Sequence, residues 1–285
     1  MSSYIDLHTH TTASDGSCTP GELVWLARDA SLVAVAITDH DTVAGCAEAT
    51  AAGPAAGVEV VCGVEVSAQS DLPGQLHLLG LFVDPEHPRL GAWLEWIRAA
   101  RHRRNPKIVE RLKALGIPVE MAEVEARATS GEVVGRPHIA QVLLDKGVVP
   151  SVTDAFLRYL AKGAPAYVDR ERTTAAEAFA IIHAAGGLAV LAHPQLCRAR
   201  DWEELARFVR GLKELGLDGM EVHYPTLTPD EQARLAALAS KLGLLAGGGS
   251  DFHGSVKPGL QLGTGFGSLR VPAALLNAMH AARRR

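Results

Sequence analysis

The sequence is poor in aromatic residues and carries no strong excess of charge of either sign. Phe, Trp and Tyr make up 5% of the 285 residues, and the formal net charge at pH 7 is −4. A charge so near zero gives no global attraction to nucleic acid, so a polyanion would have to bind at a local basic patch. Because few aromatic side chains are available to stack on bases, we expect base recognition to be loose.

Cysteines and long hydrophobic runs are also scarce. The four cysteines, Cys18, Cys46, Cys62 and Cys197, form no C-x-x-C pair. The sequence therefore predicts neither a disulfide framework nor a thiolate zinc site, and buried reduced thiols are expected. The longest apolar runs are shorter than a membrane span, and no charged and then apolar leader opens the chain. We expect a soluble, cytoplasmic protein with no membrane partner, and no feature predicts a protein partner.

What the sequence does contain is a series of seven short runs rich in Val, Ile, Leu and Ala. Since these runs do not alternate in polarity, they predict strands buried on both faces, which is the pattern of a parallel sheet. Helical segments lie between them, many with a polar residue at the start and Gly at the end. The predicted strands cover residues 4–7, 33–38, 58–66, 76–83, 188–192, 219–223 and 244–247, and the helical segments include 21–30, 174–185, 201–215 and 229–242.

The alternation of strands and helices predicts an α/β fold, a (β/α) barrel with its chemistry at the carboxyl ends of the strands. The chain of 285 residues is somewhat longer than the ~250 residues typical of such a barrel. We therefore expect one barrel, formed by residues 1–88 and 169–285. A mostly helical insertion at residues 89–168 is expected to act as a substrate-binding cap.

Six of the twelve histidines fall in five short clusters that also contain acidic or glycine residues, and each cluster closes an apolar run. Residues two apart on a strand point to the same face, so His8 and His10 can bind one ion together. Asp6 points with them but lies deeper. Asp15, in the loop that follows, is the better candidate ligand.

Other candidate ligands follow later strands. His40 is flanked by Asp39 and Asp41, one of which is expected to fix the imidazole tautomer. Glu65 is a lone carboxylate at the end of a buried strand, where an unpaired charge would be costly. A metal is its natural partner, and its two oxygens can bridge two ions.

A single histidine on an apolar strand is more often a hydrogen-bonded core residue than a ligand, and His77 taken alone fits that interpretation. Independent core histidines would not fall repeatedly at the carboxyl ends of strands beside Asp and Glu, however. The joint placement of the clusters therefore predicts a buried site for several metal ions.

These clusters resemble the successive motifs of the PHP (polymerase and histidinol phosphatase) family. The motifs are His8-x-His10 with Ser14-Asp15-Gly16, Thr38-Asp39-His40-Asp41, Gly63-Val64-Glu65, His193-Pro194 and Gly249-Ser250-Asp251-Phe252-His253. The resemblance covers essentially the whole chain. It implies a distorted seven-stranded (β/α) barrel that holds two or three divalent ions and hydrolyses phosphoesters. By motif, the ligands would be His8, His10, Asp15, His40, Glu65, His77, His193, Asp251 and His253.

The resemblance favours Mn²⁺, and imidazole and carboxylate ligands without sulfur suit Fe²⁺ or Zn²⁺ as well. Such a site supports attack on phosphorus by a metal-bound hydroxide, while the ions neutralise charge on the nonbridging oxygens. No phosphoenzyme is required. His193 is the candidate catalytic residue for protonating the leaving group, and Asp15 is a candidate substrate contact as well as a ligand.

Two basic signals in the insertion predict phosphate contacts. Asn105 before Pro106 predicts an N-cap and a helix start directly after the basic run that includes Arg101 and Arg104. Arg136 is predicted to lie beside another helix start, where free N–H groups and the guanidinium can share a phosphate. A solvated basic helix face is the alternative interpretation.

The insertion also resembles one bacterial subgroup of the family. The shared segments are Arg103-Arg104-Asn105-Pro106, Gly135-Arg136-Pro137-His138-Ile139-Ala140 and Gly163-Ala164-Pro165-Ala166-Tyr167-Val168. Members of this subgroup remove the 3′-phosphate of 3′,5′-nucleoside bisphosphates, converting adenosine 3′,5′-bisphosphate to AMP, and some also trim short RNA from its 5′ end. The resemblance implies a small nucleotide substrate or a short RNA 5′ end. By resemblance and charge, the phosphate contacts would be Arg101, Arg104, Asn105, Arg136 and His138.

Three alternatives fit the same motifs. A histidinol phosphatase-like phosphomonoesterase would share the metal site, but the basic insertion favours a second anionic group on the substrate. A DNA-directed nuclease of the family predicts a polymerase partner, and nothing in the sequence resembles a polymerase. A noncatalytic metal-dependent binding module would be expected to have lost ligands, and none of the expected positions is missing.

Overall fold

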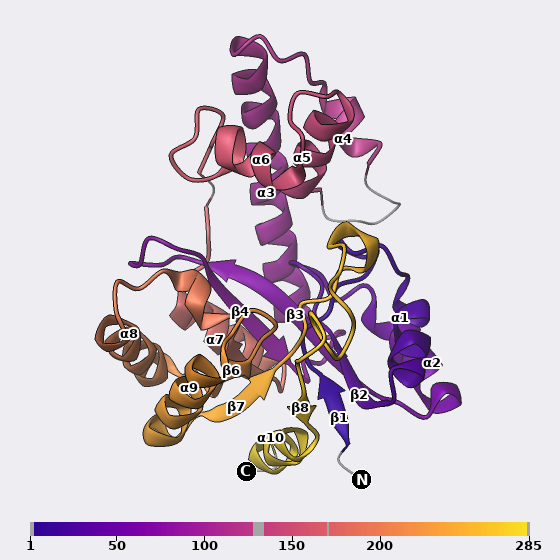
Figure 1. Ribbon diagram of the computed structural model, residues 1–285, viewed down its shortest axis with the longest axis vertical. Coiled ribbons are helices and arrows are strands. Elements are labelled where there is room, and N and C mark those ends of the chain that lie inside the picture. Colours follow the sequence, from indigo (N-terminus) through magenta and orange to yellow (C-terminus); the bar gives the residue numbers. More distant parts are fainter. Residues whose placement is uncertain (1–2, 128–133, 170, 284–285) are drawn as a thin grey trace. The chain divides into compact units, whose positions relative to one another are not determined.

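The computed structural model describes residues 3–127, 134–169 and 171–283 (Figure 1). The chain divides into two compact units, which we call the barrel unit and the insertion unit. The barrel unit comprises Met1–Trp93 and Thr173–Arg285, and the insertion unit comprises Leu94–Arg172. Among the described helices, none has the length and apolar character that crossing a membrane requires.

The barrel unit contains an eight-stranded, nearly closed sheet in the order β7-β6-β5-β4-β3-β2-β1-β8. All seven predicted strands are present. An eighth strand of two residues, β8, pairs antiparallel with β1 and was not predicted. The strands are β1 (Tyr4–Asp6), β2 (Leu32–Ile37), β3 (Glu59–Ala68), β4 (Leu76–Leu81), β5 (Leu188–Leu191), β6 (Gly219–His223), β7 (Leu245–Gly248) and β8 (Val271–Pro272).

The expectation of a parallel pattern throughout is wrong for β4. This strand runs antiparallel to both of its neighbours, β3 and β5. The reason is the connection between β3 and β4, residues 69–75, which is too short for the crossover helix that a parallel pair needs. β4 is still buried on both faces, so its composition resembles that of a parallel strand.

The segments that follow β1 and β7 meet at the carboxyl ends of the strands. The Leu7 N–H donates to the Gly248 carbonyl at 3.2 Å, and the Asp251 N–H donates to the His8 carbonyl at 2.9 Å. A parallel bridge joins Thr9 to Phe252. The first and last histidine clusters of the sequence are thereby brought side by side.

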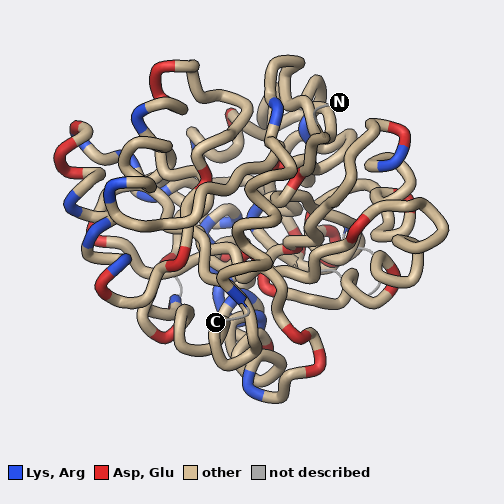
Figure 2. Tube along the Cα trace, turned by 90° about the horizontal axis from the view of Figure 1, so that it is seen from below, with Lys and Arg blue, Asp and Glu red and all other residues tan. Residues whose placement is uncertain are grey.

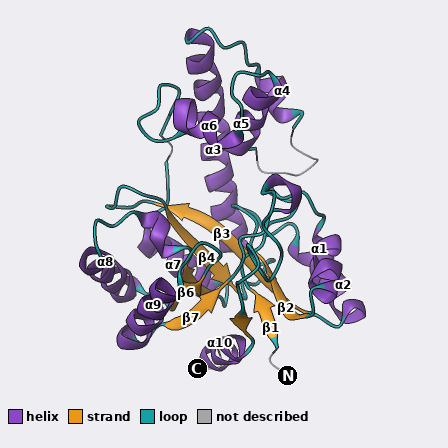
Figure 3. Cartoon of the chain, viewed as in Figure 1, coloured by secondary structure: helices purple, strands orange, loops and turns teal. Residues whose placement is uncertain are grey.

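The helices of the barrel unit flank the sheet (Figure 3). As predicted, several begin at a polar cap and end at a left-handed glycine: α9 is capped by Thr228, whose hydroxyl accepts from Glu231 N–H, and it ends at Gly243, with φ 64°. In the view of Figure 2, Lys and Arg residues are interspersed with Asp and Glu residues around the edge of the trace. The helices are α1 (Pro20–Asp29), α2 (Cys46–Ala56), α7 (Ala175–Ala184), α8 (Trp202–Leu215), α9 (Pro229–Leu242) and α10 (Ala274–Arg283).

The insertion unit is built from helices and loops, without a strand among its described residues (Figure 3). The expectation that Asn105 caps a new helix is wrong, because α3 continues through Pro106. The Asn105 amide instead donates to the Val134 carbonyl at 3.0 Å, and its oxygen accepts from Arg104. The helices are α3 (Pro88–Ala114), which begins in the barrel unit, α4 (Met121–Glu125), α5 (Arg136–Asp145), α6 (Val152–Ala155) and a π-helical turn, η1 (Phe156–Leu160).

The C-terminal helix α10 contributes to the core of the barrel. Leu276 and Met279 are 4% and 0% exposed and belong to the same apolar cluster as Ile5 and Val190. A Cβ atom added at Gly247 of β7 would lie 3.1 Å from Met279 Cε, so the glycine allows the close packing of helix on strand. The fold therefore depends on α10 although it carries no predicted ligand.

We expect Met279→Ala to lower the free energy of unfolding by ~2–5 kcal/mol, because the substitution leaves a cavity in a fully packed core. Urea unfolding followed by circular dichroism measures the change. Asn277→Ala, at an exposed position of the same helix, is the control and should stay within ~0.5 kcal/mol of the parent protein. Equal stability of the two variants would show that α10 does not support the core.

Candidate metal centre

Glu65 lies at the centre of the site. Its side chain is 1% exposed, its Oε2 atom faces the ring nitrogens of three histidines at 3.0–3.4 Å, and its Oε1 atom faces two more at 2.8 and 3.1 Å. The five imidazoles belong to His8, His10, His40, His77 and His193. Burial alone would raise the pKa of Glu65, but His40, His77 and His8 hold this pKa well below its ordinary value. The residue is therefore an ionised carboxylate in the core.

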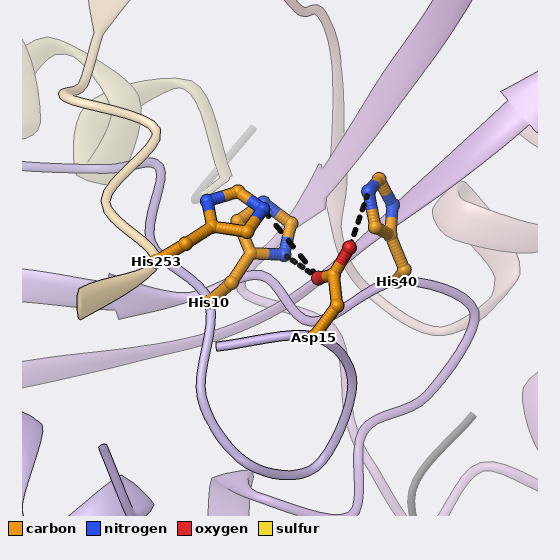
Figure 4. A group of neighbouring side chains, drawn as sticks. All are labelled: His10, Asp15, His40 and His253. Carbon is orange, nitrogen blue, oxygen red and sulfur yellow. Dashed lines mark ion pairs between the residues drawn. The ribbon is translucent and has the colours of Figure 1, made fainter. Parts of the chain in front are cut away.

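A second carboxylate, Asp15, lies on the loop after β1 and faces three histidines (Figure 4). Its Oδ1 atom is 3.4 Å from His253 Nε2 and 3.7 Å from His10 Nδ1, and its Oδ2 atom is 3.9 Å from His40 Nε2. Burial would raise the pKa of Asp15, but His40, His253 and His10 lower it instead. His10 and His40 thus lie between the two carboxylates.

Asp251 provides the third carboxylate. Its Oδ1 atom lies 3.5 Å from His8 Nε2 and 3.3 Å from His10 Nε2. Its Oδ2 atom accepts from the Tyr224 hydroxyl at 2.9 Å and from Lys257 Nζ at 2.6 Å. One oxygen therefore faces the histidines while the other is held by two donors.

Three groups of side chains have ligand atoms close enough to share an ion, all within 4.8 Å of one another inside each group. His10 and Glu65 each belong to two of the groups. The groups are His10, Asp15, His40 and His253; His8, His10 and Glu65; and Glu65, His77 and His193. The arrangement suits two or three adjacent ions that share ligands.

The histidine nitrogens and carboxylate oxygens of this site are better suited to bind divalent ions than to hydrogen-bond one another. Among the described residues, five buried ring nitrogens of the cluster have no hydrogen-bond partner. Buried polar atoms are otherwise nearly always satisfied in folded proteins. Imidazole and carboxylate donors without sulfur suit Mn²⁺, Fe²⁺ or Zn²⁺. The unpartnered atoms are His8 Nε2, His10 Nδ1, His10 Nε2, His40 Nδ1 and His193 Nδ1.

The backbone is strained at three positions around the site. Asp41, His193 and Asp251 have φ angles of 56°, 29° and 55°, in a region that residues other than glycine rarely occupy. Strain of this kind persists where the surrounding structure enforces it, and it is common at functional sites. At His193, which follows β5, and Asp251, which follows β7, the strained backbone directs the side chain toward the site.

All nine residues predicted as metal ligands line this one site. Eight of them belong to the three groups, and Asp251 faces His8 and His10 beside them. His77, which taken alone fits a core histidine, lies 2.8 Å from Glu65. The catalytic role of His193 stays a prediction, and its ring also belongs to one of the three groups.

Sequence reasoning offered two residues, Asp39 and Asp41, for fixing the His40 tautomer, and it missed three other neighbours of the ligands. Asp39 does not hold His40; it accepts from the backbone and hydroxyl of Thr11 and from the hydroxyl of Ser14, so it shapes the loop that carries Asp15. The missed residues, Glu221, Tyr224 and Lys257, contact predicted ligands. Glu221 had a signal like that of Glu65, a lone carboxylate in a buried strand.

The five predicted phosphate contacts all lie in the insertion unit. Arg101, Arg104 and Asn105 are on α3 and are at most 9% exposed. Arg136 opens α5 as predicted, and His138 Nδ1 accepts from the Gly135 N–H at 3.0 Å at the same helix start.

Arg136 has an unusual environment within the insertion unit. Its guanidinium lies 5.7 Å from the ring centres of both Phe156 and Tyr167, and it donates to a backbone carbonyl. Burial and the nearby charges of Arg101 and Arg172 lower its pKa to about 10, although Tyr167 opposes the shift. Arg136 makes no ion pair with a carboxylate in the described part of the chain. The neighbouring Arg172 pairs with Asp169 at 2.7 Å, so Arg136 is the guanidinium of this group for which the described residues offer no paired carboxylate.

The barrel and its buried cluster of histidines and carboxylates define a metal-dependent hydrolase. A family model described as the PHP domain matches residues 6–220. The chain belongs to the PHP family, whose members include metal-dependent phosphoesterases.

Three curated relatives cover most of the chain. The 5′-3′ exoribonuclease of Haemophilus influenzae is 38% identical over 254 residues, or 89% of this chain and 91% of that protein. The 3′,5′-nucleoside bisphosphate phosphatase of Chromobacterium violaceum is 35% identical over 260 residues, or 91% and 90%. The phosphoribosyl 1,2-cyclic phosphate 1,2-diphosphodiesterase of Eggerthella lenta is 34% identical over 270 residues, or 94% and 99%. All three names describe hydrolysis of phosphoesters.

A solved structure supports the same assignment. The crystal structure of a protein from Bifidobacterium adolescentis, described as a metal-dependent phosphoesterase, superposes with a TM-score of 0.85 at 34% identity. The match covers 99% of this chain and 96% of that one. The expected fold class is thereby confirmed.

We expect Glu65→Gln to reduce the number of bound divalent ions by at least one and to lower phosphoester hydrolysis by more than ~100-fold. The reason is that Glu65 faces five imidazoles and is expected to bind the ions directly. Loss of a residue that only hydrogen-bonds a ligand typically lowers metal affinity or activity by ~10–100-fold, and loss of a ligand should lower them further. Metal content after dialysis and initial rates measure both effects. Glu59→Gln, at an exposed position of the same strand, is the control. Unchanged metal content in Glu65→Gln would contradict a central role for this carboxylate.

Proposed function

We propose that this hydrolase removes the 3′-phosphate of 3′,5′-nucleoside bisphosphates, releasing a nucleoside 5′-monophosphate, and that it also acts from the 5′ end of short RNA. The observation that carries the proposal is Arg136, a half-buried guanidinium of the insertion unit that makes no ion pair with a carboxylate among the described residues. A substrate with one phosphate needs only the ions and their ligands, whereas the second phosphate of a bisphosphate would give the Arg136 guanidinium an anionic partner. The names and coverage of the first two relatives support the same substrate class.

The geometry around Arg136 supports binding of a second phosphate. A guanidinium that lies over two aromatic rings is restricted in position and keeps N–H donors in a fork that matches phosphate oxygens. Arg101 supplies a second charge, and His138 and Asn105 fix the helix start and the neighbouring turn through hydrogen bonds. We assign the non-reacting phosphate to Arg101, Arg104, Asn105, Arg136 and His138, which makes the insertion the substrate-binding cap.

The residues of the barrel unit would hold the ions and position the reacting phosphate. When bound, divalent ions neutralise charge on a phosphoryl oxygen and lower the pKa of water. Glu65 shares one group of ligand atoms with His8 and His10 and another with His77 and His193. Asp39 holds the loop that carries Asp15, which we propose contacts the substrate as well as an ion. We propose Mn²⁺ as the native metal, with Fe²⁺ or Zn²⁺ able to occupy the same donors.

The experiment that tests the proposal is a substrate panel for the manganese-loaded protein. It should contain adenosine 3′,5′-bisphosphate, AMP, histidinol phosphate, phosphoribosyl 1,2-cyclic phosphate, 5′-phosphorylated RNA and 5′-phosphorylated DNA, with products identified by chromatography. We expect the bisphosphate to give AMP and inorganic phosphate with the highest kcat/KM. A higher kcat/KM for histidinol phosphate, the cyclic phosphate or DNA would contradict the proposed substrate but not the metal centre. Metal binding without turnover of any substrate would favour a noncatalytic binding module.

Arg136→Ala should raise KM for adenosine 3′,5′-bisphosphate by ~10-fold or more and leave KM for p-nitrophenyl phosphate within about twofold, because charge-assisted hydrogen bonds contribute ~1.5–3 kcal/mol. Arg103→Ala is the control, since Arg103 also lies in the insertion unit, in the basic run that includes Arg101 and Arg104, but is 56% exposed and pairs with Glu171. Steady-state kinetics of both variants on both substrates provides the measurement. Equal effects of Arg136→Ala on the two substrates would remove Arg136 from the phosphate site.

A further inference from the structure

β6 ends beside the metal centre, although none of its residues was predicted as a ligand. The strand lies between β5, which leads to His193, and β7, which leads to Asp251. Its residue Glu221 is 1% exposed. A carboxylate is almost never buried to this degree unless it is paired or hydrogen-bonded, so its partners indicate its role.

Both oxygens of Glu221 contact residues of the candidate centre. Oε1 lies 3.0 Å from His8 Nδ1, and Oε2 accepts from the backbone N–H of His193 at 2.5 Å. The opposite ring nitrogen, His8 Nε2, lies 3.4 Å from Glu65 Oε2 and 3.5 Å from Asp251 Oδ1. The two nitrogens of His8 therefore face different carboxylates on opposite sides of the ring.

A carboxylate can accept a hydrogen bond only from a protonated nitrogen. With the proton at Nδ1, the neutral ring presents the lone pair of Nε2 toward Glu65, which is the state that an ion requires. The second oxygen acts on the backbone, where His193 has a φ of 29°. A hydrogen bond to the His193 N–H stabilises this strained conformation and the direction of its side chain.

We propose that Glu221 is a positioning residue that fixes His8 as an Nε2 ligand and holds the backbone of His193, so that one carboxylate organises two ligands from different strands. This inference rests on the proposed metal centre. Both oxygens of Glu221 are directed at nitrogens of the ligand residues and not at the volume that the ligand atoms face. It belongs to none of the three ligand groups formed by the described residues.

The chain offers a matched control at the amino ends of the same strands. Asp218 Oδ2 lies 2.7 Å from His183 Nε2 and accepts from the backbone N–H of Ala189 at 2.8 Å. This pair repeats the contacts of Glu221, an imidazole and a backbone amide, but lies away from the predicted ligands. Because one oxygen makes both contacts, Asp218→Asn can retain them, so this variant reports the effect of removing a carboxylate charge from such an arrangement without affecting an ion.

The test compares Glu221→Gln with Asp218→Asn and the parent protein. An amide has one accepting oxygen, so Glu221→Gln retains at most one of the two contacts. Competition with a chromophoric chelator should show the apparent dissociation constant for Zn²⁺ rising by ~10–100-fold in Glu221→Gln. The number of ions bound at saturation should be unchanged, and Asp218→Asn should bind like the parent.

Each other outcome has a distinct meaning. An unchanged dissociation constant in Glu221→Gln, or the loss of one ion at saturation, would overturn the positioning role, the latter by making Glu221 a ligand. A parent protein that binds no Zn²⁺ would overturn the metal centre itself. Nitrogen NMR of the Zn²⁺-loaded parent provides a test without any variant: we expect the proton of His8 at Nδ1, and a proton at Nε2 would contradict the proposal.

Discussion

The structure depends on an ionised carboxylate buried in the core of the barrel. Glu65 faces five imidazoles at 2.8–3.4 Å, and its charge would be strongly destabilising without compensation. The compensating imidazoles come from β4 and from the segments that follow β1, β2 and β5, so no single local segment supplies them. Divalent ions would satisfy both the carboxylate and the ring nitrogens that have no hydrogen-bond partner in the described residues. Folding and function are therefore linked at this residue.

The rest of the barrel unit positions these groups. Hydrogen bonds between the segments after β1 and β7 join His8 to Asp251, which are far apart in the sequence. Around the ligands lies a layer of residues that hold them: Asp39 fixes the loop of Asp15, Tyr224 and Lys257 hold Asp251, and Glu221 contacts His8 and His193. Such outer partners set the tautomer and direction of ligands and are needed for tight metal binding.

Much of this architecture could be predicted from the sequence, because apolar runs and the residues that end them are local signals. The seven longer strands, the helix start at Arg136 and the candidate ligands follow from such signals. The antiparallel direction of β4 could not be predicted, since a strand buried on both faces has the same composition in either direction. The hydrogen bond that Asn105 makes to Val134, in place of a helix cap, joins segments distant in the sequence, so it could not be predicted either. The partners of Glu221 and Asp39 depend on contacts between distant segments, which a single sequence does not reveal.

The measurement that tests this account most directly is anomalous diffraction from crystals of the manganese-loaded protein. Ion positions are located there without reference to activity or to a substrate. The account predicts two or three anomalous peaks grouped around Glu65, with at least one peak at coordination distance, ~2.0–2.3 Å, from a Glu65 oxygen. Manganese bound elsewhere with the Glu65 cluster free of anomalous density would contradict it.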